Sequence, residues 1–259
     1  MDIYGFSPAT FMSFLLTLMR VSLIVFMMPF YGGEYIPITV KAALCLVLTM
    51  AVWPYLSFPG EAFPAHPFAI GTMLLAELVL GLLMGLCVYF VFAAIQTGGE
   101  IMGFQMGFTM LSMADPTTGT QTSVTAQILH IVALMVFLAL DGHLYLLRAL
   151  ADSFSIIPPG GFRITGPLVD NVLQLSGTIF SLAVRIAAPV IAAILMAELT
   201  LALMGRAAPQ MNLLTMGFPL KIAVGFFFIG ILFTTLSLHL EEFIVGMRSM
   251  FSGLMEVAR

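Results

Sequence analysis

Charged residues are scarce in this chain, and their scarcity excludes an ordinary soluble domain. Of 259 residues, 61% are hydrophobic and only 8% are charged, and the mean hydropathy is +1.10. A soluble domain carries about 25% charged residues. Positions 78–99 and 116–140 hold no charge at all, and an apolar run above about 18 residues predicts a transmembrane helix. The composition therefore predicts a membrane protein without a sizeable soluble domain.

Other absences narrow the class further. The net charge is −4 and no basic cluster occurs, which argues against nucleic acid as a partner. Cys45 and Cys87 lie inside apolar runs, so we expect two buried hydrophobic side chains rather than a disulfide or a metal pair. The N-terminus has neither a basic residue nor a small-residue cleavage site before the first apolar run. We therefore expect that run to remain as a helix and not to be cleaved as a signal peptide.

The sequence also lacks the patterns of an enzyme. It contains no GxxxxGK[ST] phosphate loop and no GxSxG nucleophile turn, and its four histidines have no metal-ligand spacing. Asp141, Gly142 and His143 interrupt an apolar stretch. We interpret them as a turn or helix end, with an intramembrane acid or proton relay as the rarer alternative. We predict no catalytic residue, no metal and no cofactor.

The order of apolar segments predicts an all-α membrane protein of about six long, partly kinked helices. Two segments, 68–97 and 172–204, have at least 30 residues and are too long for a simple span of about 20. Pro189 is expected to kink the fifth segment. The widest break contains Pro-Pro-Gly-Gly at 158–161, where a chain of two structural parts would divide. The expected segments are 11–30, 38–56, 68–97, 123–147, 172–204 and 213–240.

Five charged residues fall inside these segments: Arg20, Glu77, Arg185, Glu198 and Lys221. A lone charge at the bilayer centre costs at least about 2.5–3.5 kcal/mol, so each residue needs a partner or water. Arg185 and Glu198 lie on roughly opposite faces of a straight helix, so we expect their partners on other helices or other chains. Snorkelling of the side chain near a helix end is the alternative, and it applies best to Arg20 and Lys221.

The stretch at 98–123 has the most distinctive pattern. Its glycines recur every four residues and give a helix one bare face, while methionines and phenylalanines form stripes on neighbouring faces. A movable seal in a membrane passage and a glycine-faced helix packed in a membrane core both explain this pattern, and the pattern alone favours the second. The glycines are Gly99, Gly103 and Gly107, and a similar pair, Gly81 and Gly85, predicts close packing in the third segment.

Four blocks of sequence, spread over nearly the whole chain, carry a family resemblance. They are RVSLIVFMMPFYGGEYIPITVKAAL at 20–44, AELVLGLLMGL at 76–86 with GGEIMGFQMGF and ADPTTGTQ after it, LALDGHLYLLRAL at 138–150, and AAPQMNLLTMGFPLKIAVGF at 207–226. Together they resemble the FliR family, the export-gate subunits of the bacterial flagellar type III secretion apparatus, whose injectisome counterpart is the SctT family.

The resemblance implies a non-enzymatic subunit that helps to form and seal the pore through which unfolded flagellar proteins are exported. It implies FliP-like and FliQ-like membrane subunits and a FlhB-like protein as partners. It places the chain in the bacterial inner membrane, within the flagellar basal body, with helices that extend beyond the bilayer plane. A lipid-surrounded bundle of the conventional kind is therefore not expected.

The resemblance also implies two features of this chain. One is a FliP-like part at 1–165 joined to a FliQ-like helical hairpin at 166–259. The other is a pore plug formed by the loop region between the middle helices. Carried over by position, the residues of the plug are Met102, Phe104, Met106, Phe108, Met110, Met113, Asp115 and Pro116.

Three other functions stay open. The same gate role in a virulence injectisome would barely change the fold. A small-molecule or ion transporter should show paired internal repeats and a polar site at the membrane midplane. A structural scaffold would use the glycine stripe only to pack helices.

Overall fold

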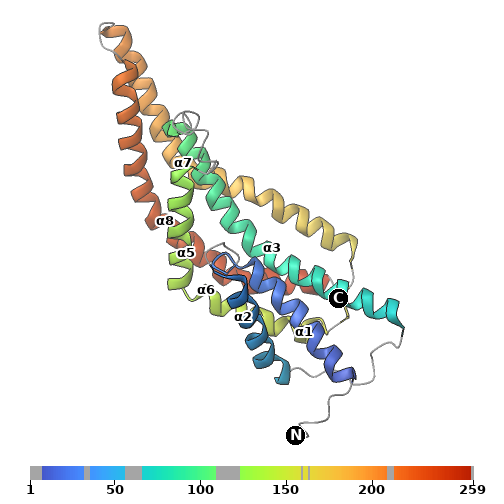
Figure 1. Cartoon of the computed structure of the whole chain (residues 1–259). Coiled ribbons are helices and arrows are strands. Elements are labelled where there is room, and N and C mark those ends of the chain that lie inside the picture. Colours follow the sequence, from blue (N-terminus) through green and yellow to red (C-terminus); the bar gives the residue numbers. More distant parts are fainter. Residues whose placement is uncertain are drawn as a thin grey trace. The chain divides into compact units, whose positions relative to one another are not determined.

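The computed structural model describes residues 8–31, 36–55, 66–108, 123–158, 160–162, 164–208 and 213–257. Within these ranges the chain consists of seven α-helices and one short 3-10 helix and contains no strand (Figure 1). The expected all-α fold class is confirmed. The elements are α1 (Pro8–Met27), α2 (Ile38–Val52), η1 (Trp53–Tyr55), α3 (Pro67–Met106), α5 (Val124–Ala139), α6 (Gly142–Ile156), α7 (Gly166–Ala207) and α8 (Leu213–Val257).

Four helices of the described chain, α1, α3, α7 and α8, are long and apolar enough to cross a membrane. α5 and α6 make a fifth span only as a pair that is bent by 67°. The expected apolar segment at 123–147 therefore contains the end of one helix and the start of the next. Asp141 lies between the two helices with a φ of 56°, a left-handed conformation that Asp tolerates better than most residues. The expected turn at this position is confirmed.

The sequence placed several other helix ends too early. α3 continues beyond Thr97 to Met106, and α8 continues beyond Leu240 to Val257. α7 is a single helix of 42 residues that contains Pro189. α2, with 15 residues, is shorter than a bilayer-crossing helix.

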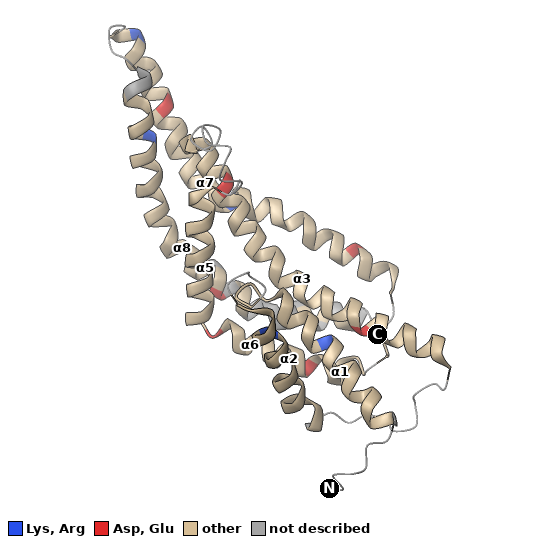
Figure 2. Cartoon of the chain, viewed as in Figure 1, with Lys and Arg blue, Asp and Glu red and all other residues tan. Residues whose placement is uncertain are grey.

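The helices form two compact units. Unit 1 covers residues 1–90, 141–175 and 244–259, and unit 2 covers residues 91–140 and 176–243. α3, α7 and α8 each have one part in unit 1 and the other part in unit 2. Charged residues are sparse along the described parts of the helices (Figure 2), so each charge in the interior needs a specific explanation.

In unit 1, α1 lies against a bare face of α3. Gly81 and Gly85 stand four and eight positions after Glu77, so these three residues share one face of α3. A Cβ atom added to Gly81 would lie 3.0 Å from Cβ of Leu23 and 3.1 Å from the Arg20 carbonyl oxygen. Added to Gly85, it would overlap the Met27 side chain. The two glycines therefore allow the backbones of α1 and α3 to approach closely.

The same face carries a buried ion pair. The side chains of Arg20 and Glu77 are both fully buried. Nε of Arg20 donates to Oε2 of Glu77 at 2.6 Å, and Nη2 donates to Oε1 at 2.9 Å. This two-bond geometry matches the planar guanidinium to the carboxylate, and such charge-assisted bonds are stronger than neutral ones.

The remaining donors of the guanidinium reach α6 and the connection that follows it. Nη1 donates to Oγ of Ser153 at 3.2 Å, and both Nη atoms donate to the Ile157 carbonyl oxygen at 3.1 Å. The Phe154 ring lies 4.2 Å from the guanidinium carbon, a cation–π contact. Glu77 also accepts the backbone N–H of Gly160 at 2.9 Å. One ion pair thus ties α1, α3, α6 and the Pro/Gly connection together.

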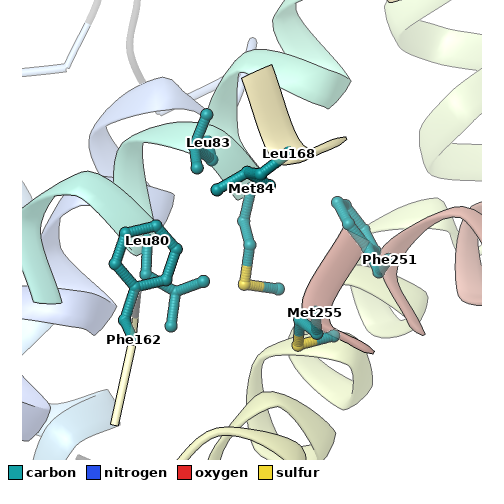
Figure 3. Close-up of a pocket in the computed structure, with 7 residues that line it drawn as sticks. All are labelled: Leu80, Leu83, Met84, Phe162, Leu168, Phe251 and Met255. Carbon is teal, nitrogen blue, oxygen red and sulfur yellow. The ribbon is translucent and has the colours of Figure 1, made fainter. Parts of the chain in front are cut away.

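The C-terminal part of α8 packs in unit 1 against α3 and the start of α7. Figure 3 shows Phe251 and Met255 facing Met84 across a small apolar gap. The gap has a volume of about 10 Å³, close to the minimum that holds one water molecule. The gap leaves room for no larger ligand, so the interior of unit 1 is closely packed here.

We predict that Arg20→Met lowers the free energy of unfolding by about 3–5 kcal/mol, because it leaves the Glu77 carboxylate buried without a counter-ion. Arg20→Met combined with Glu77→Leu should be less destabilising than Arg20→Met alone. The measurement is SDS-induced unfolding in mixed micelles, followed by circular dichroism. If the losses of the two single variants simply add in the double variant, the two residues are not coupled.

Candidate functional site

The candidate site lies in unit 2, where α3 ends. The side chains of Met102 and Met106 are fully buried, whereas Phe104 is 67% exposed. The two methionines lie four positions apart and therefore on one helix face, which is turned to the interior of the unit. Phe104, between them in the sequence, points away from this interior.

α3 ends at Gly107. This residue has a φ of 91°, and its N–H donates to the Phe104 carbonyl oxygen at 3.0 Å. A φ in this range is readily adopted only by glycine, and a glycine of this kind is a common helix terminator. The chain therefore leaves the helix at the position that the glycine pattern marks, and Phe108 follows outside it.

Three consecutive residues at this end contact α8. A Cβ atom added to Gly225 would lie 2.6–2.7 Å from Cε, Sδ and Cγ of Met106, so the methionine lies directly on the α8 backbone. Gly107 faces the Phe218 ring. The rings of Phe108 and Phe226 meet edge to face at 6.1 Å with an interplanar angle of 76°. We call Met106, Gly107 and Phe108 with their α8 partners the α3–α8 seam.

A neighbouring face of α3 is held by α5. A Cβ atom on Gly99 would overlap the Ala126 backbone, and one on Gly103 would overlap the hydroxyl groups of Ser123 and Thr125. Oγ1 of Thr125 donates to the Gly99 carbonyl oxygen at 2.8 Å. The glycine stripe thus brings α3 and α5 into backbone contact, and a buried hydrogen bond fixes their register.

Four residues of the expected plug, Met110, Met113, Asp115 and Pro116, lie outside the described residues. The described residues contain no group of three His, Cys, Asp or Glu side chains that could hold a metal ion. The chemistry of the seam itself is therefore apolar contact between methionine, glycine and phenylalanine.

Of the five charges inside the apolar segments, four are paired within the chain. Arg20 and Glu77 form the buried pair of unit 1. Glu198 of α7 and Lys221 of α8 form a second ion pair in unit 2, with side-chain exposures of 35% and 28%. Arg185 is exposed. A partner for Arg185 on another chain stays a prediction.

The sequence did not predict the residues of α5 and α8 that contact the end of α3. No spacing pattern in the sequence marks these residues, which are Phe218, Gly225 and Phe226 of α8 and Thr125 of α5. Gly225 precedes three consecutive phenylalanines in an apolar helix, and a small residue at such a place is a weak signal of close packing. The signal does not name α3 as the partner.

We predict that Gly225→Leu lowers the free energy of unfolding by about 1–3 kcal/mol, because the added side chain overlaps Met106 in a packed interior. Gly230→Leu on the same helix is the matched control, since a Cβ atom there has no neighbour within 4 Å. Thermal unfolding of the purified chain in detergent measures both. An equal loss of unfolding free energy in both variants would mean that the contact between Gly225 and Met106 does not contribute to stability.

Comparison with known proteins gives one consistent result. Residues 11–247 match the family described as "Bacterial export proteins, family 1". The chain is 34% identical to the flagellar biosynthetic protein FliR of Pectobacterium carotovorum subsp. carotovorum over 204 residues, which cover 79% of this chain and 77% of the relative. It is 31% identical to FliR of Bacillus subtilis (strain 168) over 221 residues, 83% and 84% of the two chains.

A relative with another role is similar to nearly the same degree. The surface presentation of antigens protein SpaR of Shigella sonnei is 30% identical over 182 residues, 70% of each chain. The family match runs from α1 into α8, and these relatives cover most of the chain. The chain therefore belongs to family 1 of the bacterial export proteins and is a membrane subunit of a type III export apparatus.

Proposed function

We propose that this chain is a non-enzymatic subunit of a flagellar type III export gate, in which it helps to form and seal the pore for unfolded flagellar proteins. Its partners are FliP-like and FliQ-like membrane subunits and a FlhB-like protein. It acts in the inner membrane within the flagellar basal body. Two similar FliR proteins named for flagellar biosynthesis support the flagellar assignment.

The α3–α8 seam is the observation that carries the sealing role. Met106 and Phe108 stand directly before residues 109–122 and rest on a glycine and a phenylalanine of α8. Methionine is unbranched and polarizable and adapts to irregular surfaces, and an aromatic edge-to-face pair contributes about 0.5–1.5 kcal/mol beyond area burial. Contacts of this strength close a passage and still separate when a substrate arrives.

Helix lengths support a gate that extends beyond the bilayer plane. α3, α7 and α8 have 40, 42 and 45 residues. At about 1.5 Å per residue, a helix of this size is about 60 Å long, whereas the hydrocarbon core of a bilayer is about 30 Å thick. Part of each helix must therefore be covered by something other than lipid tails, and neighbouring gate subunits are the proposed cover.

The proposed division into a FliP-like part at 1–165 and a FliQ-like hairpin at 166–259 is supported by local features. The connection after α6 contains Pro158 and Gly160, and α7 begins at Gly166. Within unit 2, Leu201 lies near Gly217 and Glu198 pairs with Lys221. The residue numbers of the contacting pairs increase along α8 while they decrease along α7, as in an antiparallel helical hairpin.

We predict that Phe108→Ala makes the assembled gate leak ions or small molecules severalfold faster, because it removes the ring that rests on Phe226. Phe227→Ala is the matched control, since Phe227 follows Phe226 on α8 and is mostly exposed. The measurement is dye or ion flux through gates of verified composition in membrane vesicles. A tight gate with Phe108→Ala, together with failed assembly for Gly103→Leu, would support a scaffold without a sealing role.

The injectisome gate is the second candidate, and similarity to SpaR of Shigella sonnei favours it. Expression of this chain in a flagellated host that lacks its own family member distinguishes the flagellar role from the injectisome role. Restored motility supports the flagellar role. Restored effector secretion in an injectisome host, without motility in the first host, would replace it.

A further inference from the structure

Unit 2 contains an apolar cavity with a single cationic side chain in its wall. The cavity has a volume of about 290 Å³ and is open on one side. All of its lining residues belong to unit 2. Three helices contribute a pair of residues four positions apart: Val91 and Ile95 from α3, Leu182 and Ile186 from α7, and Leu236 and Leu240 from α8. Each helix therefore turns one continuous apolar face to the cavity.

Arg185 of α7 supplies the cation. It is exposed, and it makes no hydrogen bond or ion pair with any residue that the structure describes. Glu198, the other charge of the apolar segment 172–204, is already paired with Lys221. A guanidinium group beside apolar surface favours an anion with two oxygens in its plane, and phosphate has this geometry.

The size of the cavity decides between kinds of apolar occupant. An engineered cavity of about 150 Å³ binds benzene, so a single aromatic side chain from a neighbouring protein would leave this cavity about half empty. Pockets that enclose whole drug-sized molecules start at about 300 Å³. A flexible hydrocarbon chain matches the volume and can adapt its shape to the apolar side chains that line the cavity.

We propose that this cavity holds one acyl chain of an anionic phospholipid and that Arg185 binds the lipid phosphate. The proposal depends on the chain being a membrane protein and not on the sealing role. Basic pockets between transmembrane helices recognise anionic headgroups in this way. Because lipid tails are as apolar as leucine, the tail fills the cavity without net hydrophobic gain. Selectivity for the lipid therefore rests on the charge of the headgroup.

The test is native mass spectrometry of the full chain in micelles that contain either phosphatidylglycerol or phosphatidylcholine. The wild type should retain one phosphatidylglycerol molecule in preference to phosphatidylcholine. Arg185→Gln should lower that retention about fivefold, the factor for one cation near a lipid headgroup, and Arg185→Lys should keep most of it. Arg206→Gln is the matched control, because Arg206 is an exposed cation of the same helix outside the cavity wall.

A second variant tests the cavity independently of the charge. Val91→Phe fills part of the cavity and leaves Arg185 in place, so it should also reduce phosphatidylglycerol retention. If Arg185→Gln fails to fold, lipid retention by Val91→Phe alone tests the proposal. Wild-type retention by both variants, or equal retention of the two lipids, would overturn the proposal. So would a wild-type chain that retains no lipid while Arg185→Gln loses a partner subunit in a pull-down, because the cation would then bind a carboxylate of that partner.

Discussion

A charge buried in an apolar interior has to be neutralised and hydrogen-bonded, and this constraint organises unit 1. The Arg20 guanidinium makes five hydrogen bonds, two to Glu77, one to Ser153 and two to Ile157, which match its five N–H groups. Arg20 and Glu77 meet only because the backbones of α1 and α3 approach closely. Gly81 allows that approach, since any Cβ there would press on the Arg20 carbonyl oxygen. The ion pair therefore requires the glycine face, because the two charged side chains meet only when α1 and α3 approach closely.

Unit 2 uses glycine for two different kinds of contact around the end of α3. Toward α5, Gly99 and Gly103 permit backbone contact, and the hydrogen bond from Thr125 fixes it. Toward α8, Gly225 receives a flexible methionine side chain. The first contact is directional and sensitive to small shifts, while the second tolerates rearrangement because thioether side chains have several rotatable bonds. The end of α3 is thus rigid on one side and adaptable on the other.

Hydropathy predicted the helices well and their ends poorly. The third apolar segment was expected to end at Thr97, yet α3 continues to Met106. Helical hydrogen bonds do not depend on side-chain polarity, and neighbouring helices cover the bare glycine face that follows. The break at Asp141 had a local signal in Asp-Gly. No local signal joins Arg20 to Glu77, which lie far apart in the sequence, because such a pairing is decided by tertiary packing.

The α8 side of the seam is itself anchored. Lys221 lies between Phe218 and Gly225 and pairs with Glu198 of α7, so the residues that receive Met106 and Phe108 belong to a cross-linked hairpin. Opening of the proposed seal would have to separate only the apolar contacts that Met106 and Phe108 make with α8. The Thr125 hydrogen bond and the ion pair of the hairpin need not break. Gly107, with its positive φ, stands directly after the last residue of α3, so the helix that α5 fixes ends where these apolar contacts lie.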